Sequence, residues 1–339
     1  MSQLAGLYRQ MARVRAFELV IAGLWTEGLI SGEMHLGTGE EGVVAGVMAH
    51  VTASDALAAD HRSTPPFLLH GIEPVSMLRE LLGRSDGLCG GRGGHMHLFS
   101  REHLAASSGI VGASAPTGAG FALAASRLRP GTISVAFFGE GAANQGMLLE
   151  TMNLASAWRL PLLMVCKDNA WSITTRTSSV TGGDLVARAK AFGLETGTVD
   201  GLDPIAVSDR AKDLISRIRL GRGPAFLHAR CTRLDGHFLG DGMVAIAAGA
   251  SVEGVRAMAR ITRAAFTPGG ASLKGRASAV RDLLKLLGGV RADTRAGKGD
   301  PLVLVANRLR REGVDTVRID DEVATEMASI VATALQEGS

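Results

Sequence analysis

The sequence of 339 residues lacks the marks of secreted, membrane-spanning and nucleic-acid-binding proteins. Its three cysteines, Cys89, Cys166 and Cys231, show no metal-ligand spacing, so we expect them to be reduced core or loop residues. No segment approaches the roughly 18 uninterrupted apolar residues of a membrane span, and the N-terminal segment has no signal-peptide apolar core. The net charge of +3 is small for this length, which argues against nucleic acid as a partner. We therefore expect a cytoplasmic protein that binds neither membranes nor nucleic acids.

A nicotinamide-binding fold is also disfavoured, because no G-x-G-x-x-G fingerprint opens the first βαβ unit. A different glycine-rich turn, residues 139–146 (GEGAANQG), follows residues 132–138 (TISVAFF), whose composition is typical of a buried strand. Residues 160–166 (LPLLMVC) have the composition of a second buried strand. Between them we predict a helix over about residues 142–159, with an apolar face made by Leu148, Met152, Ala155 and Trp158. This order of strand, glycine-rich turn, helix and strand predicts an α/β fold, with a parallel sheet and helices on both of its faces.

Glu140 and Asn169 follow the two predicted strands and lie 29 positions apart. Because parallel strands end at the same edge of a sheet, both side chains are expected to reach one ion. Magnesium prefers oxygen ligands and keeps substrate phosphates in its shell, so Glu140, Asn169 and the Trp171 carbonyl would suffice. The turn at the helix N-terminus suits an anion. In the alternative interpretation, Glu140 is a helix N-terminal acid and Asn169 a turn residue.

Other motifs accompany this pair along the chain. They are residues 11–18 (MARVRAFE), 35–41 (HLGTGEE), 61–62 (HR), 91–97 (GRGGHMH), 109–116 (GIVGASAP), 199–201 (VDG), 221–224 (GRGP) and 236–237 (GH), followed by Asp241. With the Gly-Glu-Gly and Asn signature, they resemble the α subunit of the E1 component of thiamine diphosphate-dependent 2-oxo acid dehydrogenases, including acetoin dehydrogenases. The resemblance covers about residues 10–241 strongly. It implies a thiamine diphosphate-binding fold with a helical C-terminal extension.

The resemblance implies a role for each matching residue. Magnesium ligands would be Glu140, Asn169 and the carbonyl of Trp171, the diphosphate would be held by Arg62 and the amides of Gly141 and Ala142, and His61 would also bind the cofactor. A guanidinium suits this task because its planar fork pairs with phosphate oxygens and stays charged.

Four further residues would contact the organic part of the cofactor. Gly109 and Val111 would touch the aminopyrimidine through their backbone, and Ile173 would hold the cofactor bent, although a core position for Ile173 is the alternative. His237 would transfer protons or hold an intermediate, since imidazole has the one unperturbed pKa near neutrality. His97, and still more His95, carry less functional weight.

Several positions depart from the family pattern. Glu140 stands where most members have Asp, and His95 replaces a serine. Thr64, which precedes two prolines, takes the place of a common histidine, and Asp235 takes that of another. Two consecutive prolines stiffen the segment, so we expect a reshaped substrate pocket. Pyruvate is consequently a weak assignment.

The implied activity is decarboxylation of a 2-oxo acid, or cleavage of an acyloin such as acetoin, with transfer of the product to a lipoyl group on an E2 partner. A non-catalytic binding or regulatory subunit with the same fold is the alternative. The chain has room for one diphosphate-binding domain but not for the pyrimidine-binding domain that supplies a carboxylate to the cofactor. We therefore expect a separate β subunit in an α₂β₂ heterotetramer, and close subunit packing through the small residues 118–125.

We divide the chain into a helical segment (residues 1–50), the cofactor-binding α/β domain (51–240) and a helical extension (241–339). Within the domain we expect loops at residues 87–94 and 172–184, the latter a mobile flap. Helices are predicted at 184–192 and 204–220, and a strand at 224–232. Beyond residue 242 we expect mostly helix.

Overall fold

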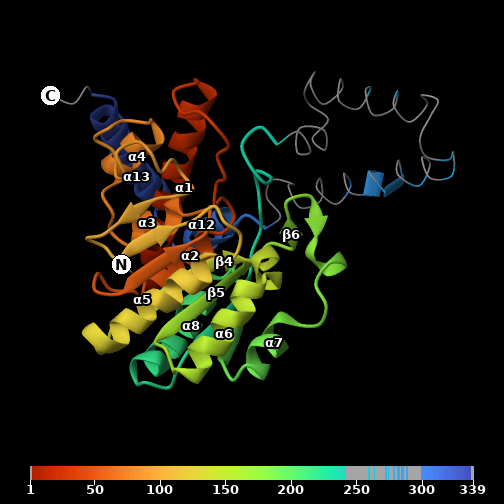
Figure 1. The fold of residues 1–339 in the computed structure, drawn as a ribbon. Coiled ribbons are helices and arrows are strands. Elements are labelled where there is room, and N and C mark those ends of the chain that lie inside the picture. Colours follow the sequence, from red (N-terminus) through yellow and green to blue (C-terminus); the bar gives the residue numbers. More distant parts are fainter. Residues whose placement is uncertain are drawn as a thin grey trace.

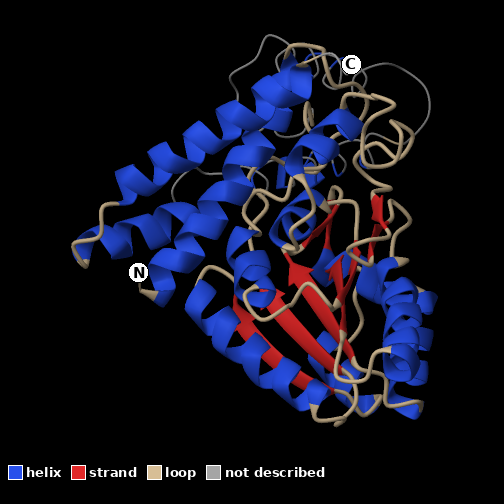
Figure 2. Cartoon of the chain, turned by 90° about the vertical axis from the view of Figure 1, so that its left-hand side faces the viewer, coloured by secondary structure: helices blue, strands red, loops and turns tan. Residues whose placement is uncertain are grey.

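The computed structural model describes residues 2–241 and 299–336, together with single positions between 259 and 288. A seven-stranded sheet lies between layers of helices (Figures 1 and 2). The strand order is β2-β3-β1-β4-β5-β9-β8, and every pair is parallel except β2–β3. The strands are β1 (Ala56–Ala59), β2 (Phe99–Ser100), β3 (Ala105–Ser107), β4 (Ser134–Gly139), β5 (Leu162–Asp168), β8 (Glu195–Asp200) and β9 (Ala225–Arg230). This confirms the predicted α/β class.

The helices within residues 2–241 and 299–336 are α1 (Gln3–Thr26), α2 (Glu41–Met48), α3 (Thr64–Leu69), α4 (Pro74–Leu81), α5 (Ser114–Leu128), α6 (Gly146–Ala157), α7 (Leu185–Ala191), α8 (Pro204–Arg219), α12 (Pro301–Arg311) and α13 (Thr316–Leu335). Two 3₁₀ turns, η1 (Glu140–Asn144) and η2 (Thr177–Ser179), and a small hairpin of β6 (Trp171–Ser172) and β7 (Thr175–Arg176) complete them. None of these helices combines the length and the apolar character needed to cross a membrane.

The alternation of side chains along the strands separates two cores. Val135 and Phe137 of β4 join the core formed with α1, α2 and α8. Ala136 and Phe138 point the opposite way and join the core formed with α5, α6 and α7. Since successive side chains of a strand alternate between faces, a strand covered by helices on both sides is apolar at every position. That is why residues 135–138 form an uninterrupted apolar run.

Each end of the three central strands, β4, β5 and β9, lies within two residues of its predicted position. Strand β8 was missed because its sequence, ETGTVD, is polar, as suits an edge strand exposed on part of its surface. The predicted flap, residues 172–184, contains η2 and all of the β6–β7 hairpin except its first residue, Trp171. The expectations for residues 242–298 lie outside the described residues, apart from single positions.

The predicted helix over residues 142–159 is wrong at both ends. A 3₁₀ turn occupies Glu140–Asn144, and α6 begins only at Gly146, because Gln145 is extended with ψ 138°. Leu148, Met152 and Ala155 are buried as expected, but Trp158 caps the C-terminus of α6 and is 56% exposed. Trp158 would extend the apolar face only if α6 continued past Ala157, but α6 ends there.

The C-terminal helices pack against the first helix (Figure 1). Leu4, Leu7 and Met11 of α1 share a small core with α12 and Ile319 of α13. Polar contacts reinforce it: the Tyr8 hydroxyl donates to Asp320 at 2.9 Å, and Arg13 pairs with Glu326 at 2.7 Å. The first and last described segments of the chain therefore form one helical layer.

Helix α5 lies so close to the sheet that one of its glycines admits no side chain. A Cβ built at Gly118 would be 2.9 Å from the Cβ of Ala136, and Ala122 and Ala125 are also buried. Gly118, Ala122 and Ala125 pack within the chain. The prediction that residues 118–125 provide a subunit-packing surface is therefore wrong for these three residues. The exposed side of α5 carries larger apolar residues, Leu123 and Leu128.

This contact predicts opposite effects for two matched substitutions. Gly118→Ala should destabilise the protein by about 1–3 kcal/mol through overpacking. Gly120→Ala, on the same helix with nothing within 4 Å of a built Cβ, should stabilise it by roughly 0.5–1 kcal/mol through helix propensity. Denaturant unfolding measures both free energies. Equal changes in the two variants would contradict the packing.

Candidate active site

One cavity of about 290 Å³ lies at the carboxyl edge of the sheet. Every residue that the sequence predicts to be in the site lines this cavity. Strands β1, β4, β5 and β9 end there, and the chain that follows each strand contributes to the wall. The predicted residues that line it are His61, Arg62, Gly109, Val111, Glu140, Gly141, Ala142, Asn169, Trp171, Ile173 and His237. The topology thus brings together groups up to 176 positions apart.

Glu140 and Asn169 lie side by side. Glu140 is 1% exposed, and its carboxylate accepts hydrogen bonds from the backbone amide of Asn169 at 3.1 Å and from the Thr177 hydroxyl at 3.0 Å. Burial raises the pKa of Glu140 to about 7, helped by the negative charge of Asp168. The Asn169 side-chain oxygen accepts from the Trp171 amide at 3.1 Å, which closes a tight turn and leaves that oxygen a second lone pair.

Gly141 and Ala142 belong to the η1 turn rather than to the start of an α-helix. The turn is secured from α7: the Arg188 guanidinium donates to the Ala143 carbonyl at 2.8 Å and to the Asn144 side-chain oxygen at 3.1 Å. A Cβ at Gly141 would lie 2.6 Å from the Ser172 hydroxyl, so glycine permits this close approach.

Ile173 is not a core residue. It is 54% exposed at the cavity and has a φ of +54°, a left-handed conformation that is rare for a β-branched residue. Ala170 is also left-handed, with φ +65°. Arg233 donates to the Ile173 carbonyl at 2.8 Å and so supports this backbone. Strain of this kind costs of order 1–3 kcal/mol and typically occurs at functional sites.

Beneath the cavity lies a group of buried charges. The Lys167 ammonium, on β5, pairs with Glu40 at 2.7 Å and Asp60 at 3.1 Å, and its side chain is 1% exposed. Burial would raise the pKa of Asp60, but Lys167, His61 and Arg62 hold it below its usual value. Arg62 donates to the carbonyl of Leu36 and, at 2.9 Å, to that of His237. These contacts join three loops at the sheet edge.

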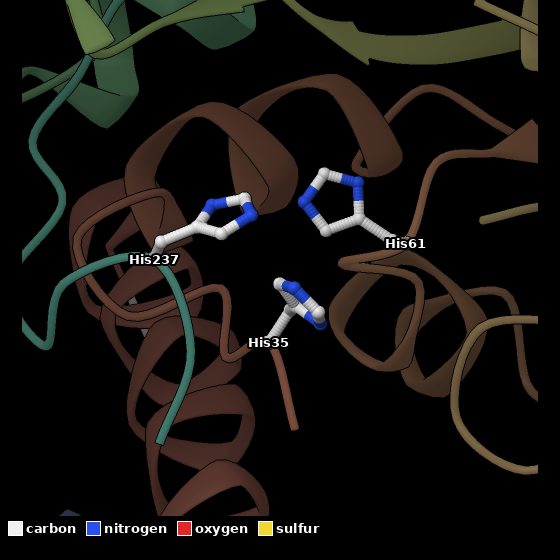
Figure 3. A group of neighbouring side chains, drawn as sticks. All are labelled: His35, His61 and His237. Carbon is white, nitrogen blue, oxygen red and sulfur yellow. The ribbon is translucent and has the colours of Figure 1, made fainter. Parts of the chain in front are cut away.

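Four histidines gather at one side of the cavity: His35, His61, His95 and His237. The rings of His35 and His61 are 4.8 Å apart between centroids, those of His35 and His237 4.7 Å, and His95 stacks on His35 at 5.3 Å (Figure 3 shows the three that face one another). Burial, followed by nearby positive charge, lowers the pKa of His35 and His237 to about 4 and that of His61 to about 2. The imidazoles are therefore neutral at physiological pH.

Sequence reasoning missed Arg233, His35, Glu40 and Asp60, which also line the cavity, and Lys167 below it. Burial lowers the pKa of Arg233 to about 10. One available signal was position: Asp60 and Arg233 closely follow β1 and β9, as Glu140 and Asn169 follow their strands. The sequence motifs give His95 little functional weight, yet His95 is buried against His35.

The buried ion pairs predict a large effect of removing their shared cation. Lys167→Met should cost about 3–5 kcal/mol of stability, because Glu40 and Asp60 would remain buried without compensation. Arg308→Met removes the exposed Arg308–Glu312 pair and should cost about 0.5 kcal/mol or less. The two variants are compared by denaturant unfolding. A Lys167→Met loss no greater than that of the control would contradict this account.

Comparison with known proteins places this geometry in a family. The profile of the dehydrogenase E1 component family matches residues 9–263. The α subunit of the acetoin:2,6-dichlorophenolindophenol oxidoreductase of Cupriavidus necator is 36% identical over 98% of this chain and 88% of its own length. The Bacillus subtilis subunit of the same name is 36% identical over 69% of this chain and 71% of its own.

A pyruvate dehydrogenase E1 α subunit shows similar likeness. That of Zymomonas mobilis is 36% identical to this chain, over 70% of this chain and 68% of its own length. The family implies the use of thiamine diphosphate, and the relatives are α subunits of oxidoreductases. This chain therefore belongs to the dehydrogenase E1 component family, as an α-type subunit.

Proposed function

We propose that this chain is the cofactor-binding α subunit of an E1 enzyme that binds thiamine diphosphate through Mg²⁺ at the described cavity. With a β subunit it decarboxylates a 2-oxo acid or cleaves an acyloin such as acetoin, and the product passes to a lipoyl group of an E2 partner. The observation that carries the proposal is the buried pair Glu140 and Asn169 at the carboxyl edge of the sheet. The named relatives are subunits of oxidoreductases, which favours this function over that of a non-catalytic subunit.

The donor set fits magnesium. Among the residues that the structure describes, Glu140 has hydrogen-bond donors around it but no ion pair, although it is buried. A bound divalent cation would supply the missing positive charge and return the pKa of Glu140 to a low value. Glu140, Asn169 and the Trp171 carbonyl provide three oxygens, and diphosphate and water would complete an octahedron.

The walls fit a diphosphate and its organic group. Arg62 and Arg233 put positive charge at the cavity, and the Gly141 and Ala142 backbone can approach phosphate oxygens closely. Gly109, Val111 and Ile173 offer backbone and apolar surface for the organic part. When bound, thiamine diphosphate supplies the nucleophile and the electron sink, while these residues bind it, orient it and exclude water.

His237 is the proposed proton-transfer residue. Its backbone is fixed at both sides, since its amide donates to Asp241 at 3.0 Å and its carbonyl accepts from Arg62. The fixed backbone aims the imidazole at His35 and the cavity (Figure 3). Because its pKa is lowered to about 4, the ring is neutral and can accept a proton.

The mouth of the cavity favours a partner chain. Ile110, Val111 and Ile173, all at the cavity, are between 53% and 60% exposed. Exposed apolar side chains that cluster at a site are typical of protein interfaces and of ligand-binding grooves. A β subunit covering this mouth would bury them and bring the carboxylate that the cofactor requires.

The metal assignment is tested by calorimetry. Glu140→Ala should abolish measurable Mg²⁺-dependent binding of thiamine diphosphate, because octahedral ligation tolerates few missing oxygens. Glu150→Ala, an exposed glutamate on α6, is the matched control and should bind normally. Unchanged affinity in Glu140→Ala would refute the assignment.

The role of His237 is tested in an α/β preparation with an artificial electron acceptor. His237→Asn should lower turnover by roughly 10² or more, a typical loss for a general acid or base, while cofactor affinity changes far less. His103, which is half-buried and does not line the cavity, serves as control through His103→Asn. Turnover of His237→Asn equal to that of the unmodified protein would remove His237 from the mechanism.

The need for a partner is tested by assaying the chain with and without a β subunit. We expect the isolated chain to turn over neither pyruvate, branched-chain 2-oxo acids nor acetoin, and the mixture to turn over one of these classes. Light scattering should show a heterotetramer. An isolated chain that decarboxylates 2-oxo acids unaided would overturn the proposed requirement for a β subunit.

A further inference from the structure

His35 and His95 form a buried pair whose hydrogen bonds determine where their protons lie. The backbone amide of His35 points at Nε2 of His95, at 3.1 Å, and Nδ1 of His35 lies 3.0 Å from the same nitrogen. A backbone amide can only donate. Nε2 of His95 must therefore present its lone pair, and the proton of the neutral ring resides on Nδ1.

The tautomer of His95 determines that of His35. Since Nε2 of His95 carries no proton, the contact with Nδ1 of His35 is a hydrogen bond only if His35 donates. His35 is then the Nδ1–H tautomer, and its Nε2 carries a lone pair. Both rings are neutral at physiological pH: burial, with neighbouring positive charge, lowers the pKa of His35 to about 4 and that of His95 to about 3. The opposite arrangement would place two N–H groups against each other in a buried site, where neither proton would have an acceptor.

The unprotonated nitrogen of His35 is the one left to act on a ligand in the cavity. His35 lines it, and one ring nitrogen from each of His35, His61 and His237 lies within 4.8 Å of the other two. Nδ1 of His35 is occupied by His95, so Nε2 is the nitrogen that remains for a ligand. Figure 3 shows the three rings converging from separate segments. Among the described residues the rings of His61 and His237 have no hydrogen-bond partner, so their tautomers are not determined in this way.

We propose that His95 is a positioning residue that holds His35 as the Nδ1–H tautomer, so that Nε2 of His35 accepts the hydroxyl proton of an acyloin. This rests on the proposed function and selects one of its two substrate classes. In acyloin cleavage the hydroxyl proton moves to Nε2, the bond between the carbinol and carbonyl carbons breaks, and the carbinol carbon leaves as an aldehyde. The electron pair of that bond passes into the electron sink that the cofactor supplies.

A base at Nε2 of His35 is needed for only one of the two substrate classes. Decarboxylation releases carbon dioxide from a carboxylate and has no hydroxyl proton to remove, so it does not need a lone pair at this position. Cleavage of an acyloin cannot form its aldehyde until the hydroxyl proton departs. A general base in reach of that proton typically contributes 10²–10⁴ to the rate.

The tautomer is tested without the cofactor, on the full chain labelled with ¹⁵N-histidine. The ring nitrogens of His35, assigned by their loss in His35→Gln, should show the Nδ1–H form, insensitive to pH between 6 and 8. His95→Ala should release His35 into a mixture of tautomers, and His95→Gln, whose amide oxygen can accept the same bonds, should restore it. An Nε2–H form of His35 in the unmodified chain would overturn the proposal.

The acceptor role is tested in the α/β preparation with acetoin and with pyruvate as substrates. His35→Ala should lower kcat for acetoin by roughly 10²-fold, and for pyruvate by no more than about threefold. His95→Ala should lower kcat for acetoin, and His95→Gln should recover it. Equal losses for both substrates would contradict the acceptor role. If the unmodified preparation turns over neither acetoin nor any 2-oxo acid, branched-chain ones included, the proposed function has failed and the acceptor role falls with it, while the spectrum alone decides whether His95 sets the tautomer.

Discussion

The site depends on a single buried ammonium group, that of Lys167, which stands at the carboxyl end of a central strand between Glu40 and Asp60. Glu40 immediately precedes α2, and Asp60 follows β1, so the cation joins the loop that carries His35 to the one that carries His61. An isolated charge at such a depth would be very costly, and only the complete arrangement is stable. The loops of the cavity therefore hold their positions relative to the sheet.

Above the buried charges around Lys167, the cavity combines two different electrostatic environments. At one side a buried carboxylate, Glu140, lacks a cation among the described residues and has a pKa raised to about 7. At the other side, histidines near Arg62 are kept neutral. The first environment suits a metal-bound anion and the second suits proton transfer to uncharged groups. A single cavity can thus bind the cofactor and act on a substrate.

Much of the sheet and the site could be predicted from the sequence, because the relevant residues follow apolar runs that only a buried parallel strand explains. Glu140 and Asn169 are such residues. The 3₁₀ turn before α6 could not be predicted, since it depends on Arg188 reaching across from α7. The histidine cluster could not be predicted either, because His35 and His95 come from loops whose meeting depends on the tertiary fold.

The most direct test of the central claim is a crystal structure of the chain with its β subunit, grown with thiamine diphosphate and Mn²⁺ in place of Mg²⁺. The account predicts an anomalous Mn²⁺ peak within coordination distance of Glu140, Asn169 and the Trp171 carbonyl, with diphosphate oxygens completing the shell. A Mn²⁺ ion and diphosphate bound elsewhere, with the Glu140 carboxylate still buried and metal-free, would contradict it.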